Sequence, residues 1–255
     1  MTWLNRFVNW KKGRPTIDIH KYRPPSVTVD VVLFTIMDGD LKVLLIQRRK
    51  EPFAGFWSLP GGFVPLSVSL ESAALQKLKE KTNVKDLYLE QLYTFDDPHR
   101  DPRGHVISVA YYALVASERF DLKPSESVSD VSWHSIYALP ELAFDHQRIL
   151  DYALQRLRNK LGYTTVGSQL LPEKFTLPEL CQIYEIILER PIDKRNFRKK
   201  IAFLDILDET GETTQKFSKK PAKLYRFKHS DIVELPQNSK QAIQPKIPRS
   251  LQGQA

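Results

Sequence analysis

The sequence predicts two folded domains: an α/β (α+β) sandwich, then a domain of two helices and a β-hairpin. Three observations predict this order. Residues 26–140 alternate β-rich runs with polar turns around one helix, and residues 140–161 form one long amphipathic pattern. After Gly162 the strand pattern gives way to helices. The length of 255 residues fits one or two domains.

The composition is that of a soluble globular chain, with 42% hydrophobic and 27% charged residues. The single cysteine, Cys181, excludes an internal disulfide framework and favours a reducing, cytoplasmic location. No apolar run reaches the roughly 18 residues of a transmembrane helix. The net charge of +8 and the pI near 9.4 are compatible with nucleic-acid binding, although the distribution of charge matters more than its sum.

The elements of the first domain follow from apolar runs and turn residues. Residues 26–37 and 41–46 flank Asp38-Gly39-Asp40, which predicts a hairpin. Residues 69–81 have helical spacing, with Ser69 as the expected N-cap. The further elements expected are strands at 87–95 and 106–115 around a polar loop at 96–104, a short edge strand at 131–134, and one long helix at 140–161.

The second domain has the element order of a winged helix-turn-helix. Residues 177–189 and 193–204 predict two helices, the second capped by Asp193. A turn at 208–212 and an alternating strand at 222–228 then complete a β-hairpin. The expected divisions of the chain are an N-terminal extension at 1–22, the first domain with its linking helix at 23–162, the winged domain at 163–230 and a disordered tail at 231–255.

Four segments together resemble one family of regulators. They are QRRKEPFAGFWSLPGGFV at 47–64, the helix that follows it, HRDPRGHVISVAYYALV at 99–115 and FTLPELCQIYEIILERPIDKRNFRKKI at 175–201. Residues 26 to about 140 resemble a Nudix domain, and residues 20–230 resemble the Nudix-related transcriptional regulators of the NrtR family. The resemblance implies a Nudix sandwich followed by a winged helix, in a prokaryotic homodimeric repressor. Such a repressor binds two-fold symmetric operator DNA and controls NAD metabolism. ADP-ribose is the common effector, and a minority of members sense a pentose such as arabinose.

The helix after the glycine pair departs from an active Nudix box. In the family pattern four glutamates hold magnesium, and with Gly62 as the first glycine their positions hold Val68, Lys77, Glu80 and Lys81. Magnesium prefers carboxylate oxygens, and two ammonium groups repel it. The resemblance therefore implies no metal, no cofactor, no catalytic residue and no diphosphatase activity in this chain.

The effector is expected in the Nudix cleft, where an ADP-ribose-like ligand needs cations for its diphosphate and flat rings for adenine. Because strand side chains alternate, one of Arg48 and Arg49 should face the cleft. Alternatives stay open for several of the candidate residues. Trp57 could pack in the core, the glycines could form a tight turn alone, and Glu80 could pair with Lys77. Arg100 and Arg103 could contact the partner subunit or lie in a solvated loop. The candidate ligand-binding residues are Arg48, Arg49, Phe53, Trp57, Gly61, Gly62, Lys77, Glu80, Arg100 and Arg103.

The second helix of the winged domain carries the candidate DNA site. Phe197, Ile201 and Leu204 supply its buried side, and the cations lie around them. Asn196 is suited to adenine and Arg195 to guanine; the alternative is a solvated charged face. The candidate DNA-binding residues are Lys194, Arg195, Asn196, Arg198, Lys199 and Lys200 on the helix, with Lys216, Lys219, Lys220 and Lys223 in the wing.

Three functions are compatible with these patterns. The favoured one is a repressor in which the effector shifts the dimer so that its recognition helices no longer match the half-site spacing. A magnesium-dependent ADP-ribose hydrolase is the second, and it would tolerate loss of the C-terminal domain. A silent Nudix scaffold that binds RNA or protein is the third, and it would show no operator preference.

Overall fold

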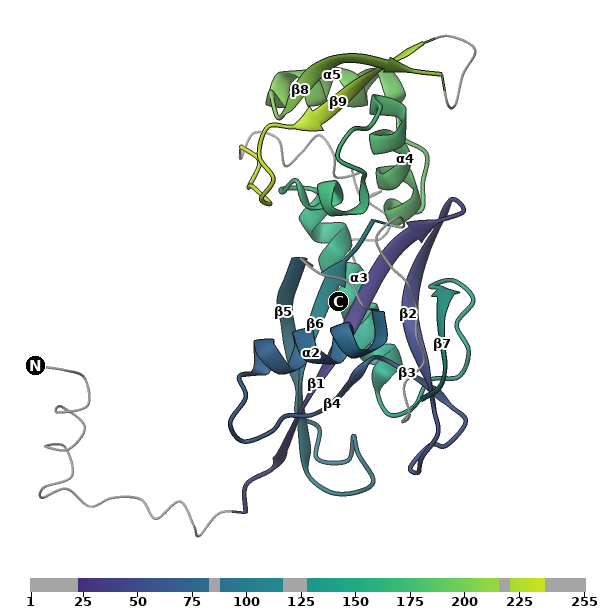
Figure 1. The fold of residues 1–255 in the computed structure, drawn as a ribbon, viewed down its shortest axis with the longest axis vertical. Helices are drawn as coiled ribbons and strands as arrows, with labels where there is room; N and C mark the ends of the chain where they lie inside the picture. Colours follow the sequence, from purple (N-terminus) through teal and green to yellow (C-terminus); the bar gives the residue numbers. More distant parts are fainter. Residues whose placement is uncertain (1–22, 83–87, 117–127, 216–220, 237–255) are drawn as a thin grey trace, which may run out of the picture.

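The computed structural model of the chain describes residues 23–82, 88–116, 128–215 and 221–236 (Figure 1). They form a sheet domain, in the lower half of Figure 1, and a helical domain with a two-stranded hairpin above it. Helix α3, His146–Leu161, runs from the first to the second. In these ranges no helix has the length and apolar character needed to cross a membrane.

A mixed sheet forms the first domain, in the order β3-β2-β1-β6-β5, with β4 paired to β1 and β7 paired to β2. Strands β1 and β2 make the predicted hairpin around Asp38 and Gly39, while β1 and β6 pair in parallel. The predicted edge strand is longer than expected and pairs with β2. The strands are β1 Ser26–Met37, β2 Asp40–Arg48, β3 Trp57–Ser58, β4 Gly61–Phe63, β5 Tyr88–Phe95, β6 Val106–Leu114 and β7 Val128–Ser135.

Two apolar layers hold this sheet, one on each face. Because side chains alternate along a strand, Val29, Val31 and Leu33 pack toward helix α2, Leu70–Thr82, whereas Val32 and Phe34 pack toward α3. All five are fully buried. Helix α2 begins as predicted, since the Ser72 amide donates to Ser69 Oγ at 3.2 Å. The sheet is thus covered by one helix on each face.

The predicted helix at 140–161 is too long by six residues, because α3 begins only at His146. The segment before it pairs with β3 instead. The amide of Ala143 donates to the carbonyl oxygen of Trp57 at 2.7 Å, and the Trp57 amide donates to Glu141 at 3.3 Å. Phe144 then has a φ of 55°, a left-handed conformation that a helix cannot contain. This turn places Phe144 and His146 at one end of the sheet.

The second domain has the predicted winged-helix order. The Thr176 and Glu179 side chains form a capping box at the start of α4, and Asp193 caps α5 by accepting from the amides of Arg195 and Asn196 at 2.9 and 3.1 Å. Phe197, on the inner face of α5, packs against the domain core. The elements are the 3-10 helix η3 Val166–Leu170, α4 Leu177–Leu188, α5 Lys194–Leu204, β8 Leu207–Thr214 and β9 Ala222–Phe227.

Two expectations for this domain are wrong. The turn predicted at 208–212 lies inside strand β8, where a change of register between Glu209 and Thr213 accommodates Gly211 at a φ of 78°. The composition of the tail predicts disorder from residue 231. Residues 231–236 instead return to the start of this domain, where the Leu235 amide donates to Tyr163 at 2.7 Å and the Leu235 side chain is buried. The extension at 1–22 and the remainder of the tail lie outside the described residues.

Candidate functional site

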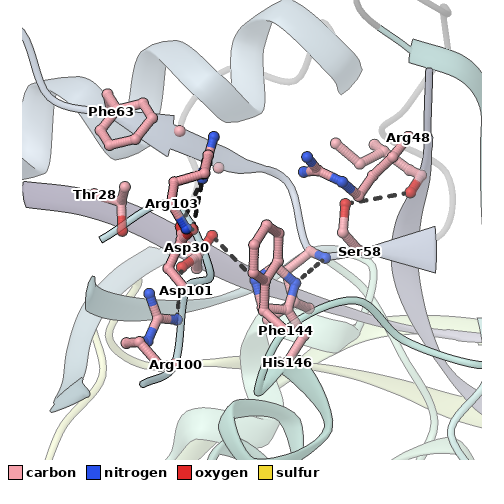
Figure 2. Close-up of a pocket in the computed structure, with 14 residues that line it drawn as sticks. Thr28, Asp30, Arg48, Ser58, Phe63, Arg100, Asp101, Arg103, Phe144 and His146 are labelled. Atoms are coloured by element: carbon pink, nitrogen blue, oxygen red, sulfur yellow. Dashed lines mark hydrogen bonds and ion pairs between the residues drawn. The ribbon is translucent and has the colours of Figure 1, made fainter. Parts of the chain in front are cut away.

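A cavity of about 120 Å³ opens between β1, the β3–β4 turn, the loop after β5 and the start of α3 (Figure 2). It lies at the end of the sheet where the glycine pair and the Phe144 turn meet. Its lining residues are Thr28, Asp30, Ile46, Arg48, Ser58, Leu59, Gly61, Gly62, Phe63, Arg100, Asp101, Arg103, Phe144 and His146.

Asp30 lies at the base of this cavity. Its Oδ2 accepts a 2.5 Å hydrogen bond from Ser108 Oγ, and its Oδ1 lies 3.6 Å from Nε2 of His146. Gly61 is required here by close approach, since a Cβ would lie 2.3 Å from Asp30 Oδ1 and 2.4 Å from the carbonyl oxygen of Val29. The glycine therefore lets the β3–β4 turn pass directly against β1.

His146 is a neutral group in this environment. Its Nδ1 accepts a 2.9 Å hydrogen bond from the Leu59 amide, so Nδ1 carries no proton and Nε2 holds the hydrogen facing Asp30. Burial lowers the pKa of His146, against the opposing effect of Asp30 and Asp145. The imidazole therefore contributes a hydrogen-bond donor to the cavity base rather than a charge.

Two arginines of the loop after β5 are held by carboxylates. Arg100 makes a two-pronged contact with Asp145, with N–O distances of 3.0 and 2.6 Å, and is almost fully buried. Arg103 makes the same kind of contact with Asp101 at 2.9 and 2.6 Å. Burial opposes the ionisation of Asp101, but the hydrogen bonds from Arg103 outweigh it and lower the pKa of that carboxyl. Arg100 is therefore part of the wall, whereas Arg103, with 41% of its side chain exposed, remains open to a ligand.

Guanidinium groups and aromatic rings alternate across the cavity. Arg48 Cζ lies 4.8 Å from the centre of the Phe144 ring, and Arg103 Cζ lies 5.6 Å from the same ring and 4.9 Å from that of Phe63 (Figure 2). Burial and the neighbouring Arg103 lower the pKa of Arg48. The hydrogen bond to Asp101 instead raises the pKa of Arg103, so both guanidinium groups lie beside flat rings but only Arg48 has its charge disfavoured.

The structure brings half of the predicted ligand residues to the cavity: Arg48, Gly61, Gly62, Arg100 and Arg103. Arg49 is exposed and does not line it. Phe53 reaches it only through Phe144, at 4.8 Å between ring centres, and Trp57 packs against the His134 ring at 4.3 Å and against the apolar core. The structure therefore favours a role for Trp57 in core packing over a role in ligand stacking.

Lys77 and Glu80 lie beside the cavity, not in its wall. Their side chains pair at 3.4 Å, as the alternative reading expected. A Cβ on Gly62 would lie 3.3 Å from Cε and 4.0 Å from Nζ of Lys77, so the ammonium lies beside the Gly62 backbone. Magnesium requires several oxygen ligands, and the described residues contain no group of three or more His, Cys, Asp or Glu side chains that could hold a metal. The residues present therefore do not fit the magnesium site of a Nudix hydrolase.

Sequence reasoning missed several lining residues, chiefly Asp30, Asp101, Phe144 and His146. The sequence does mark Asp30 as a candidate site residue, because it is the one charged residue within the apolar strand at 26–37. Phe144 and His146 had no such signal, because the pattern at 140–161 predicts a regular helix there. Their position depends on the pairing of Ala143 with Trp57, which no local pattern reveals.

Helix α5 presents an exposed polar face. Lys194, Arg195, Asn196, Arg198 and Lys199 are exposed, while Phe197, Ile201 and Leu204 are buried as predicted. Lys200 is half-buried, and burial lowers its pKa to about 8. The Asn196 amide nitrogen donates to Asp193 at 2.8 Å. In Figure 1 this helix and the β8–β9 hairpin lie at the end of the molecule farthest from β4.

The hairpin carries its own carboxylates. Lys223 Nζ lies 2.6 Å from Glu209, Lys174 lies 2.6 Å from Glu212, and Arg226 lies 3.7 Å from Asp208. The cation predicted on β9 is thus paired across the hairpin. The other predicted wing cations, Lys216, Lys219 and Lys220, fall outside the described residues.

A sheet with one helix on each face and a glycine turn at its cleft, joined to a winged helix, defines a Nudix domain fused to a DNA-binding domain. Residues 26–153 match the model of the NUDIX domain, and residues 167–227 match that of the NrtR DNA-binding winged helix domain. The chain belongs to the NrtR family of Nudix-related transcriptional regulators.

Two relatives differ in their described activity. The ADPR responsive transcriptional repressor NtrR of Acinetobacter baylyi is 40% identical over 214 residues, which cover 82% of this chain and 85% of that protein. The ADP-ribose pyrophosphatase of Methanocaldococcus jannaschii is 38% identical over 139 residues, which cover 53% of this chain and 79% of the enzyme. The repressor therefore matches both domains, and the enzyme matches about half of the chain.

Two solved structures are similar to the chain. Shewanella oneidensis NrtR complexed with a 27mer DNA has a TM-score of 0.71 and 40% identity, covering 85% of this chain and 96% of that one. The NUDIX domain of the same protein complexed with ADP ribose has a TM-score of 0.51 and 40% identity, covering 62% of this chain and 99% of that one.

Proposed function

We propose that this protein is a DNA-binding transcriptional repressor whose Nudix domain senses ADP-ribose. The observation that carries the proposal is the combination, in one chain, of a cleft of arginines and aromatic rings with an exposed basic helix on a winged domain. The family relationship and the repressor of Acinetobacter baylyi support it. The effector weakens operator binding by linkage between the two sites.

The cleft suits a nucleoside diphosphate linked to a sugar. Arg48 and Arg103 supply cations for the diphosphate, and the rings of Phe63 and Phe144 supply flat faces for the base. Thr28 Oγ1 is buried in the wall and has no hydrogen-bond partner among the described residues, so a ligand hydroxyl would satisfy it. Sites for drug-sized ligands usually enclose roughly 300–1,000 Å³, more than the 120 Å³ here. One end of the ligand therefore enters the cavity and the remainder extends over Phe63, which is 47% exposed.

Effector binding needs no metal in this proposal. In a hydrolase the magnesium ion balances the diphosphate charge, whereas here the Lys77 ammonium lies beside the Gly62 backbone at the cleft edge. The charge is therefore supplied by the chain itself. Glu80 accepts from Lys77 and holds it in this place.

Helix α5 is the proposed recognition helix. Lys194 and Arg195 occupy its first turn, where the helix dipole disfavours cations, and both are exposed. A phosphate or base edge of DNA would compensate this charge. Arg195 and Asn196 are the proposed base-reading residues, and the remaining cations of the helix and wing meet phosphate. A homodimer would present two such helices to a two-fold symmetric operator.

A DNA-binding assay on the region upstream of the chain's own gene tests this function. The full chain is titrated onto that duplex and onto a scrambled duplex, in EDTA, with and without ADP-ribose. The proposal is supported if the chain prefers the native duplex and if ADP-ribose weakens its affinity for that duplex by at least about fivefold. Equal binding to both duplexes would contradict the proposal. If arabinose rather than ADP-ribose released the DNA, the repressor function would stand and arabinose would be its effector.

An ADP-ribose hydrolase is the second candidate, favoured by the relative from Methanocaldococcus jannaschii. Only Glu80 occupies one of the four positions at which the family pattern has metal-binding glutamates. We therefore expect no enzyme-like turnover of ADP-ribose with magnesium. A rate of about 1 per second or faster, within the usual range for enzymes, would establish the hydrolase instead.

A further inference from the structure

The last turn of α4 is capped by side chains of the other domain. A helix leaves its final carbonyl oxygens without partners inside the helix. Here Tyr137, in the turn after β7, donates its hydroxyl to the carbonyl oxygen of Ile186 at 3.2 Å. Arg158, on α3, donates Nε–H to the carbonyl oxygen of Ile187 at 2.8 Å. The Ile186 carbonyl oxygen also accepts from the Glu189 amide at 3.3 Å, so Tyr137 adds a second bond there, whereas Arg158 supplies a side-chain donor to Ile187. Side chains of the sheet domain and its linking helix thus hold the end of a helix in the winged domain.

This contact lies directly before the proposed recognition helix. Arg158 also pairs with the carboxylate of Glu189 at 3.1 Å, and Glu189 is the left-handed residue that ends α4, with a φ of 55°. The Glu185 carboxylate accepts from the Ile192 amide at 2.9 Å and orders the connection that follows. Residues 190–193 then lead into α5. The groups that hold the end of α4 therefore also set the direction of α5.

Helix α3 carries the cleft at its other end. Its first residue, His146, lines the cavity, and the preceding Asp145 holds Arg100 of the cavity wall. At 1.5 Å per residue, Arg158 lies about 18 Å along the helix from His146. Arg156 and Lys160 pair with Glu90 of β5 and fasten this part of α3 to the sheet. The helix is therefore a rigid connection between the cleft and the end of α4.

We propose that Tyr137 and Arg158 are positioning residues that couple the effector domain to the recognition helix. This inference rests on the proposed repressor function. With both contacts in place, a rearrangement of the Nudix domain carries α4 and α5 with it. Without them, the apolar contacts between the domains remain, but the orientation of α5 no longer follows the effector domain. Effector binding and DNA binding then each persist, and the coupling between them is lost.

The test measures coupling separately from the two affinities. The coupling factor is the operator Kd with saturating ADP-ribose divided by the operator Kd without it, measured by fluorescence anisotropy on the full chain. ADP-ribose affinity is measured by calorimetry. The variants are Arg158→Met, Glu189→Gln and Tyr137→Phe, and the matched control is Gln155→Ala, an exposed position on the same helix that bonds to Asn159.

We expect Arg158→Met to lower the coupling factor by about fivefold or more, within the usual range of allosteric coupling, while ADP-ribose affinity stays within about twofold of the parent. Tyr137→Phe and Glu189→Gln should lower it less, and Gln155→Ala should keep the parent value. If Arg158→Met fails to fold, the coupling factor of Tyr137→Phe tests the inference. This variant removes one hydroxyl from a residue that is 47% exposed, so the fold should tolerate it.

Two outcomes would overturn the inference. Parent-like coupling factors in Tyr137→Phe and in folded Arg158→Met would show that the signal takes another route, and the repressor function would stand. A parent protein whose operator binding ignores ADP-ribose would overturn the inference together with the proposed function.

Discussion

The Lys77 ammonium lies 3.4 Å from the Glu80 carboxylate, one turn along α2 and beside the backbone of Gly62. The Nudix pattern has a metal-binding glutamate at each of these two positions, and here the first is a lysine and the second remains a glutamate. The cleft edge therefore carries a fixed cation, and its charge is present whether or not magnesium is available.

Replacement of Lys77 by methionine should weaken ADP-ribose binding by about tenfold in EDTA, because one charge-assisted contact to an anion is worth roughly 1.5–3 kcal/mol. Lys79→Met is the matched control, since Lys79 is exposed on the same helix, and residues two apart on a helix do not share a face. Calorimetry of both variants decides the matter. Equal affinities of the two variants would remove Lys77 from the effector site.

Base-reading and phosphate-binding residues should respond differently to substitution. Arg195→Ala and Asn196→Ala should each cost about 1–3 kcal/mol at the operator and change which base is preferred. Lys219→Ala and Lys220→Ala should weaken binding to all sequences alike and reduce the salt slope by about one unit each. Anisotropy titrations at several salt concentrations measure both effects. If all four variants bound a defined palindrome as the parent does, the assignment of α5 would be wrong.

His146 should make the protein less stable as the pH falls below neutrality. Burial lowers its pKa in the folded state, whereas an unfolded histidine titrates near about 6.5. Below that pH, His146 is protonated in the unfolded chain but stays neutral in the folded chain. The free energy of unfolding therefore decreases as the pH decreases, by up to about 1.4 kcal/mol per pH unit.

Thermal unfolding of the parent and of His146→Asn between pH 7.5 and 5 measures this effect. The groups around the imidazole are Asp30, Asp145, Arg100 and Arg48, and all of them remain in the variant. The parent should lose more stability over the interval than the variant does. Parallel pH profiles would contradict the prediction, because they would mean that His146 has the same pKa in the folded and unfolded chains.

Local signals predicted the elements of the fold well. The turn at Asp38 and Gly39, the caps at Ser69 and Asp193, and the buried face of α5 all depend on residues within a few positions of each other, and the structure has each of them. The turn expected at 208–212 failed because its polar residues pair across the hairpin with β9. Its composition resembles that of a loop, and only the partner strand makes it a strand.

The cleft was harder to predict because its geometry depends on distant partners. The sequence places Arg100 in a polar loop, where it could contact ligand, a partner subunit or solvent, and only Asp145, far along the chain, holds it in the cavity wall. Phe144 enters the cleft because the segment before α3 pairs with β3. Arg48 and the glycine pair were found because strand alternation and the Nudix pattern both point to them. The contact of Arg158 with α4 joins two domains, and no sequence pattern marks it.

The central claim is that one chain couples ADP-ribose in the Nudix cleft to operator DNA at α5, and reciprocal linkage tests it most directly. Calorimetry in EDTA would measure ADP-ribose affinity for the full chain alone and for the chain saturated with its operator. Operator DNA should weaken ADP-ribose binding by the same factor by which ADP-ribose weakens operator binding. Identical ADP-ribose affinities with and without the operator, or no binding at millimolar ADP-ribose, would contradict the account.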